Sequence, residues 1–292
     1  MLGAALLFSV MAVCVKWASA QYGAGELVFY RSVVGALFIA ALTRLRGRSL
    51  RTTVPSMHFW RCASGVASLL LWFYALGGLP LATAMTLNYT SSVWIALFLL
   101  GGSVLLGAAR VDGRLVAAVL AGFAGVALVL RPALEQQQLW HGLAALLSGL
   151  LAAVAYLQVT TLGRAGEPEE RIVFYFSIGG LVVGALWMLL QGASAHSPRG
   201  LALLLAIGVL ATAAQMMMTR AYRIGRTLTN ASLQYLGIVF SFLFGVLLFD
   251  DPVTWIALAG MALIVIAGLA ATLLRNRQQP DNPETRSPPL PT

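Results

Sequence analysis

Long, uninterrupted runs of apolar residues dominate this chain and restrict the folds open to it. Each run approaches the roughly 20 residues that a helix needs to cross the hydrocarbon core of a bilayer. Glycine, proline and charged residues mark the joints, as at Gly78-Leu79-Pro80 and Asp251-Pro252. Hydrophobic residues make up 59% of the 292 positions and charged residues 10%, which is too few polar side chains to cover a soluble fold. The runs do not alternate as barrel strands do, so the pattern predicts an all-α integral membrane protein.

The joints divide the chain into ten predicted transmembrane helices. The first run has no basic segment before it and no clear cleavage site, so we expect a retained span rather than a signal peptide. The predicted spans are residues 2–20, 26–43, 60–78, 82–107, 114–131, 139–162, 171–190, 200–222, 227–249 and 253–274.

Arginines between the spans predict the orientation. If the N-terminus is cytoplasmic, the opposite side carries only Arg131 and Arg199. Cytoplasmic loops of membrane proteins are enriched in Lys and Arg, so both termini are predicted to be cytoplasmic. The net charge of +9 therefore orients the chain, and we expect no nucleic-acid partner. The arginines on the predicted cytoplasmic side are Arg44, Arg46, Arg48, Arg51, Arg110, Arg114, Arg164, Arg171, Arg220, Arg223, Arg226, Arg275 and Arg277.

Short matches between the two halves of the chain indicate an internal repeat, because they occur in the same order in both halves. An odd number of spans per repeat inverts the second repeat, and inverted repeats place a solute site between them near the midplane. The prediction is two inverted five-helix repeats, residues 1–131 and 139–275, around a central cavity. A proline-rich disordered cytoplasmic tail follows at 276–292. The matches pair Val28–Ser32 with Val173–Ser177, Asn88-Tyr89 with Gln234-Tyr235, and Ala121–Ala124 with Ala259–Ala262.

Several segments resemble the drug/metabolite transporter superfamily in its ten-span, EamA-type branch, and within it the aromatic amino-acid exporters. The resemblance covers residues 1 to about 275. It implies a bacterial-type inner-membrane carrier that works by alternating access, with a cavity lined by spans one, three, four, six, eight and nine. The segments that carry it are Lys16-Trp17, Glu26–Arg31, Leu71–Leu76, Leu79–Ala84, and Gly122–Val126 before Arg131-Pro132.

Charges inside a membrane are costly and point to function. Lys16 and Arg31 are the basic residues that fall clearly within predicted spans, and either could meet a substrate carboxylate. Two structural alternatives remain open: Glu26 could pair with Arg31, or Lys16 could extend to the interface. Phe176 stands at the repeat position of Arg31, so the repeat itself does not demand a charge.

Aromatic and polar uncharged residues on the spans form a second group of candidate substrate-binding residues. Flat rings offer a large contact area with one polar edge. Asn230 and Gln234, four residues apart, share a helix face that would be expensive toward lipid. Packing between helices is the alternative for each of them. The candidates are Trp72, Tyr74, Asn88, Tyr89, Trp94, Tyr156, Gln158, Gln215, Asn230, Gln234 and Tyr235.

No Asp or Glu falls clearly within a predicted span, and coupled carriers usually need one. We therefore expect facilitated movement of amino acids and related metabolites, in the direction of export. Another amphipathic metabolite or a drug is the alternative substrate. The three histidines lie in or beside predicted loops, so none is placed within a span where it could serve intramembrane catalysis. We therefore expect no enzyme activity, metal or cofactor. Gly180 and Gly184 could form a packing step, so a monomer or weak homodimer is expected.

Overall fold

The computed structural model describes residues 1–105, 138–225 and 227–278, together with residues 114, 117, 120–122 and 124–129. All regular structure in these segments is helical, as predicted, and they contain no strand. Six of the described helices are long and apolar enough to cross a membrane. The predicted fifth span lies partly outside the described residues, and the predicted tail lies outside them after Gln278.

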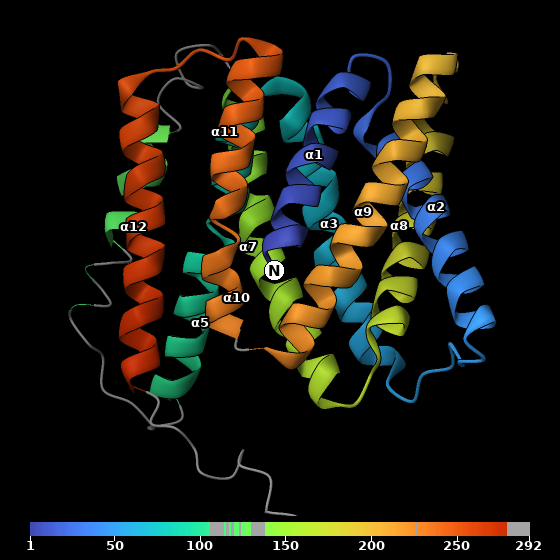
Figure 1. The fold of residues 1–292 in the computed structure, drawn as a ribbon, viewed down its shortest axis with the longest axis horizontal. Helices are drawn as coiled ribbons and strands as arrows, with labels where there is room; N and C mark the ends of the chain where they lie inside the picture. The colour runs from blue at the N-terminus through green and yellow to red at the C-terminus, as the bar shows by residue number, and fades with distance from the viewer. Residues whose placement is uncertain are drawn as a thin grey trace, which may run out of the picture.

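The helices lie side by side in one bundle (Figure 1), with α2 at one edge and α12 at the other. The closest neighbours are α3 with α7, α2 with α8, and α1 with α9. Their bounds are α1 Leu2–Ala18, α2 Ala24–Leu45, α3 Pro55–Gly78, α4 Leu81–Asn88, α5 Ser91–Leu105, α7 Leu139–Arg164, α8 Glu169–Gln191, α9 Pro198–Ile224, α10 Thr227–Leu233, α11 Leu236–Phe249 and α12 Trp255–Gln278.

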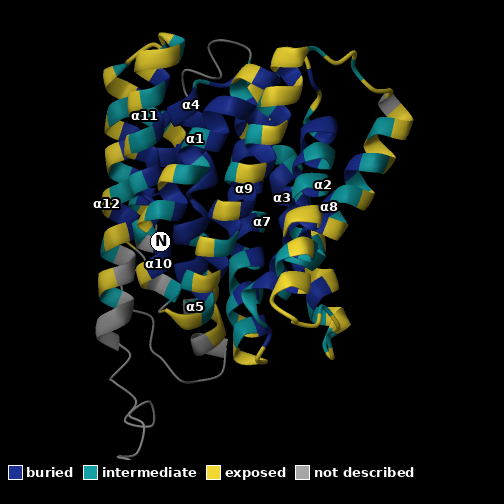
Figure 2. Ribbon diagram, turned by 45° about the vertical axis from the view of Figure 1, so that its right-hand side comes forward, coloured by how far each residue is buried: buried dark blue, intermediate teal, exposed yellow. Residues whose placement is uncertain are grey.

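Exposed residues lie on the outside of the bundle and buried residues lie within it (Figure 2), and many of the exposed residues are large and apolar, as expected of a bundle in lipid. Leu37, Leu189 and Leu247 are all more than half exposed, although each is large and apolar. In water such a surface would aggregate, whereas lipid covers it at no cost. Gly184 lies directly against Phe29, so α8 packs closely on α2 within the fold.

Two spans that were predicted to be continuous are interrupted, which corrects that prediction. The fourth span breaks after Asn88 into α4 and α5, and the ninth breaks after Leu233 into α10 and α11. The two breaks fall at the sequence pairs Asn88-Tyr89 and Gln234-Tyr235, which the repeat alignment had matched. In transporters, discontinuous helices typically surround the solute site.

Hydrogen bonds at the breaks replace those that the helices lose. Tight bonds three residues apart run from the backbone N–H of Ser92 to the carbonyl of Tyr89, and from Gly237 to Gln234. The Oγ of Ser92 donates to the carbonyl of Ala231 at 2.7 Å, which ties one break to the other. Unbonded backbone is expensive at membrane depth, and these backbone and side-chain bonds help to offset that cost at the two interruptions.

The third predicted span begins earlier than expected. Pro55 starts α3 at a position where a missing N–H costs nothing, five residues before the predicted boundary. His58 and Arg61 consequently lie within the helix and are buried. The expectation that only Lys16 and Arg31 are basic residues within spans is therefore wrong, because Arg61 joins them.

Candidate functional site

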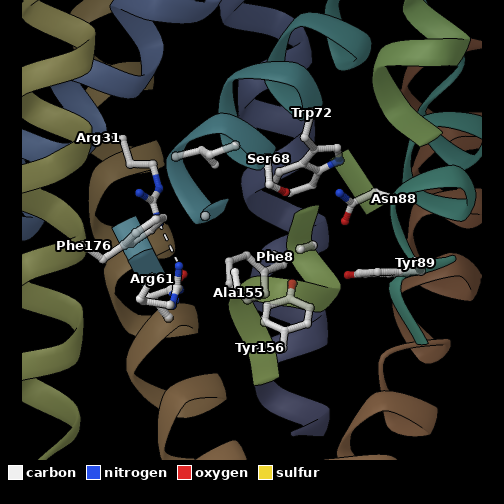
Figure 3. Close-up of a pocket in the computed structure, with 14 residues that line it drawn as sticks. Phe8, Arg31, Arg61, Ser68, Trp72, Asn88, Tyr89, Ala155, Tyr156 and Phe176 are labelled. Carbon is white, nitrogen blue, oxygen red and sulfur yellow. Dashed lines mark hydrogen bonds between the residues drawn. The ribbon is translucent and has the colours of Figure 1, made fainter. Parts of the chain in front are cut away.

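A cavity of about 60 Å³ lies inside the bundle, among side chains of α1, α2, α3, α4, α7, α8 and α9 (Figure 3). Such a volume holds only a few water molecules. An amino acid is larger, so the helices must move apart to admit one. The lining residues are Phe8, Arg31, Arg61, Gly65, Ser68, Leu69, Trp72, Asn88, Tyr89, Ala152, Ala155, Tyr156, Phe176 and Gln215.

Two buried arginines face this cavity and share one aromatic partner. Arg31 is 4% exposed and Arg61 is 2% exposed. Their guanidinium carbons lie 5.2 and 4.3 Å from the ring centroid of Phe176, and in Figure 3 one group lies above the ring and the other below it. No described carboxylate forms an ion pair with either of them. A cation–π contact offsets only part of the cost of burying a charge.

Unused hydrogen-bond donors also lie around the cavity. The Nη2 of Arg31 donates to Oε1 of Gln215 at 3.5 Å, a long bond. Among the described residues, Nε and Nη1 of Arg61, Nε of Arg31, Nε1 of Trp72 and Nε2 of Gln215 have no hydrogen-bond partner. Buried donors normally find acceptors, so the walls of this cavity can bind an acceptor-rich solute.

Asn88 is fixed by a different contact. Its Nδ2 donates to Oγ of Ser148 at 2.8 Å, and Ser148 in turn donates to the carbonyl of Ala145. Because α4 ends at Asn88, this bond holds the end of a half-helix against α7. The Asn88 amide therefore holds the end of α4 in place and also gives the cavity a polar group.

An ion pair lies at the end of the bundle that carries the short loops 79–80 and 250–254, which we name the far end. The Nζ of Lys16 lies 2.9 Å from Oδ1 of Asp251 and also donates to the carbonyl of Leu79. The Oδ2 of Asp251 accepts from the N–H of Leu81, where a carboxylate complements the first turn of α4. Four segments therefore meet at one pair of charges.

Aromatic stacking lies beside the cavity toward the opposite end of the bundle, which carries the loops 46–54 and 165–168 and which we name the arginine-rich end. The rings of Tyr156 and Tyr222 stack with their centroids 5.1 Å apart. Nε2 of Gln234 donates to the Tyr222 hydroxyl at 3.1 Å, and Oγ of Ser91 donates to Oε1 of Gln234 at 3.5 Å. Gln234, at the break between α10 and α11, thus connects the second broken helix to these tyrosines.

Ion pairs tie together the loops of the arginine-rich end. Three glutamates, at positions 167, 169 and 170, make them, on the loop before α8 and in its first turn. Glu167 accepts hydrogen bonds from Thr52 and Arg171 and contacts Nε2 of His58 at 3.1 Å. Glu170 accepts from Arg46 and Arg48, and Glu169 pairs with Arg223 at 2.8 Å.

Six of the residues expected from the sequence lie on the cavity: Arg31, Trp72, Asn88, Tyr89, Tyr156 and Gln215. The remaining candidates are held elsewhere. Lys16 pairs with Asp251, Glu26 accepts from Ser194, Tyr74 stacks on His141, Gln158 accepts from Ser64, Asn230 donates to Ala221, Gln234 bonds to Tyr222, Tyr235 packs against Gly268, and Trp94 stacks on Phe98. The alternative Glu26–Arg31 pair does not form, because Ser194 takes both carboxylate oxygens.

The sequence missed Arg61 and Phe176 as cavity residues. Arg61 had been placed next to a span boundary, and Phe176 had been weighed only as the residue that replaces Arg31. The cavity lining implied by the resemblance also needs correction: α2 and α8 contribute to it, whereas none of the described lining residues comes from α10 or α11.

The fold and the cavity define a helical, multi-pass membrane protein with an internal polar site, the class to which solute transporters belong. The chain is a member of the EamA-like transporter family, whose model matches residues 1–131 and 139–273. This family lies within the drug/metabolite transporter superfamily, so the resemblance to that superfamily and its EamA-type branch is confirmed.

Characterised relatives align along most of the chain. The pseudopaline exporter CntI of Pseudomonas aeruginosa is 32% identical over 267 residues, which cover 91% of this chain and 92% of the relative. A riboflavin transporter of Rhizobium johnstonii is 29% identical over 75% of this chain and 72% of its own. A crystal structure with 22% identity matches 94% of this chain and 98% of its own with a TM-score of 0.70, which supports the fold. The relatives are named transporters, which supports the expectation that this chain is not an enzyme.

Proposed function

We propose that this transporter moves amino acids and related small metabolites through the central cavity by alternating access, in the direction of export. The observation that carries the proposal is a cavity inside the bundle with polar and aromatic walls and two buried arginines. A carrier needs such a site that is closed to both sides in turn. One relative is named a pseudopaline exporter, which supports transport in the direction of export.

The proposed architecture has two inverted repeats, residues 1–131 and 139–275, in a bacterial inner membrane with both termini cytoplasmic. The arginine-rich end would then face the cytoplasm. The two helix breaks at matching sequence pairs support a relation between the halves. Movement would be facilitated, because no carboxylate is among the cavity-lining residues in the described part of the chain.

Uptake of labelled amino acids by liposomes that contain the purified protein tests this proposal. We expect at least one amino acid to equilibrate faster than in protein-free liposomes, without an imposed proton gradient. Failure of every amino acid to move would remove the substrate class, and a strict need for a proton gradient would remove facilitated transport.

Two matched variants show whether the solute uses the cavity. Ala155→Trp places an indole into it, whereas Ala63→Trp places the same ring into an apolar groove between α3 and α8 on the outer surface. Transport should fall only in the first variant. Ser68→Leu, a smaller obstruction of the same cavity, replaces Ala155→Trp if that protein does not fold. Equal rates in all variants would contradict passage through the cavity.

A flat, amphipathic ring system is the second candidate substrate. Trp72, Tyr89 and Tyr156 line the cavity and offer ring faces for stacking, and one relative is named a riboflavin transporter. Riboflavin therefore belongs in the same uptake panel. Its movement in the absence of any amino-acid movement would favour this second candidate.

A further inference from the structure

The two arginines of the cavity carry charge that nothing in the described part of the chain neutralises. Arg31 and Arg61 are both more than nine-tenths buried, and three of their guanidinium nitrogens have no hydrogen-bond partner among the described residues. A buried, unpaired cation is strongly unfavourable. A protein that keeps two of them at one cavity needs an anion there at some stage of its cycle.

The geometry suits two anionic groups on a single solute. Both guanidinium carbons contact the ring of Phe176, at 5.2 and 4.3 Å from its centroid, so they can be at most about 10 Å apart. They come from different helices, α2 and α3, and approach the ring from different sides (Figure 3). A carboxylate that binds one guanidinium in the bidentate manner uses both of its oxygens there, which leaves the other guanidinium for a second carboxylate.

We propose that the transported solute carries two carboxylates, one bound by Arg31 and the other by Arg61. This rests on the proposed function, since it names the substrate class of the same cavity. A simple zwitterionic amino acid fits less well, because its single carboxylate leaves one of the two guanidinium groups without an anionic partner. The indole and phenol walls can still accommodate an apolar side chain of the same solute.

Binding to the purified full-length protein tests the charge requirement without transport. The probes are N-(2-carboxyethyl)-L-phenylalanine, which has two carboxylates, and N-propyl-L-phenylalanine, which has nearly the same shape and one carboxylate. The dicarboxylate should raise the thermal unfolding midpoint at concentrations at which the N-propyl compound does not. Equal stabilisation by both probes, or by sodium chloride at matched ionic strength, would overturn the inference.

Arginine variants assign the effect to the two side chains. Arg31→Gln and Arg61→Gln should each weaken binding of the dicarboxylate by at least about tenfold, the usual consequence of losing a charge-assisted pair. Arg61→Lys should restore part of that loss. Arg220→Gln, which removes an exposed arginine on α9, should leave binding unchanged. Undiminished binding in Arg61→Gln would overturn the assignment.

The stability of the ligand-free variants separates a binding role from a structural one. A glutamine in place of an unpaired buried guanidinium removes a desolvation cost, so the ligand-free midpoint of Arg61→Gln should equal or exceed that of the parent protein. A lower midpoint would mark Arg61 as structural and overturn its role. If the amino-acid panel fails to move while the dicarboxylate binds, only the proposed substrate class is lost; if amino acids move and the dicarboxylate does not bind, this inference alone fails.

Discussion

The Nζ of Lys16 lies 2.9 Å from Oδ1 of Asp251, across 235 positions of sequence. Both side chains are largely buried, with 17% and 13% exposed. The pair joins the end of α1 to the loop before α12, and Asp251 also caps the start of α4. This contact lies at the far end of the bundle, and neither residue is among the described residues that line the cavity.

Loss of the Asp251 charge should loosen the far end. Asp251→Asn leaves Lys16 without its counter-ion, which typically costs about 1–3 kcal/mol in a partly buried site. We expect the thermal unfolding midpoint of the purified protein to fall by roughly 3 °C or more. Asp250→Asn is the matched control, since Asp250 is exposed and asparagine tolerates its left-handed backbone (φ 50°). Similar midpoints for the two variants would show that the ion pair contributes little.

Acid should weaken the arginine-rich end through Glu167. Burial by itself raises the pKa of this loop carboxyl, but hydrogen bonds from His58, Thr52 and Arg171 and the charge of Arg171 outweigh it and lower the pKa below its ordinary value of 4.5. A depressed pKa in the folded state stabilises the protein above the unfolded pKa, and this stability is lost as pH falls through the folded value. The unfolding midpoint should therefore fall as the pH drops below about 4.5.

Variants identify the group responsible for that pH dependence. Glu167→Gln should lower the midpoint at neutral pH and make it less sensitive to acid. Glu169 lies two positions after Glu167 and pairs with Arg223 instead. The Glu169→Gln variant should therefore keep the acid sensitivity of the parent protein. An unchanged pH profile in Glu167→Gln would exclude Glu167 as its source.

The first helix break depends on close approach of α7. A Cβ on Gly149 would lie 2.7–2.8 Å from the carbonyl oxygens of Leu87 and Asn88 and from Oγ1 of Thr90. These atoms belong to the turn of the break and have little freedom to move, so Gly149→Ala should lower both the unfolding midpoint and transport. Gly101→Ala meets nothing within 4 Å and should be neutral or slightly stabilising. A neutral Gly149→Ala would show that the turn can shift.

Cysteine labelling tests the proposed orientation. In a background with Cys14 and Cys62 replaced by alanine, Ser49→Cys lies at the arginine-rich end and Ala193→Cys in an exposed loop at the far end. A membrane-impermeant maleimide should label Ala193→Cys in intact spheroplasts but Ser49→Cys only after permeabilisation. The reverse pattern would invert the topology.

Much of the fold could be predicted because lipid imposes a simple rule on sequence: about 20 apolar residues for each span. The helix breaks could not be predicted in this way, because neither contains glycine or proline at its centre. Their stability comes from contacts such as that between Ser92 and Ala231, which are distant in sequence. The matching Asn88-Tyr89 and Gln234-Tyr235 pairs did mark both places.

The candidate site was predicted in part, for two physical reasons. Arg31, Trp72 and Asn88 were found because polar or aromatic groups within a span stand out against apolar neighbours. Arg61 was missed because hydropathy locates helix ends only to within a few residues, and its helix begins at Pro55. The partner of Lys16, Asp251, lies in a loop that is distant in sequence and comes close only in the folded chain. Without that partner the Lys16 charge looked unpaired, so Lys16 was expected near the substrate.

Counterflow in proteoliposomes tests the central claim, that this chain is a carrier with one alternately accessible cavity. Liposomes are loaded with unlabelled N-(2-carboxyethyl)-L-phenylalanine or L-phenylalanine and diluted into a trace of the same labelled compound. A carrier that exchanges inside for outside solute should accumulate the label transiently above its equilibrium level for at least one of the two compounds. Label that only rises to equilibrium, at a rate independent of the internal solute, would contradict the account.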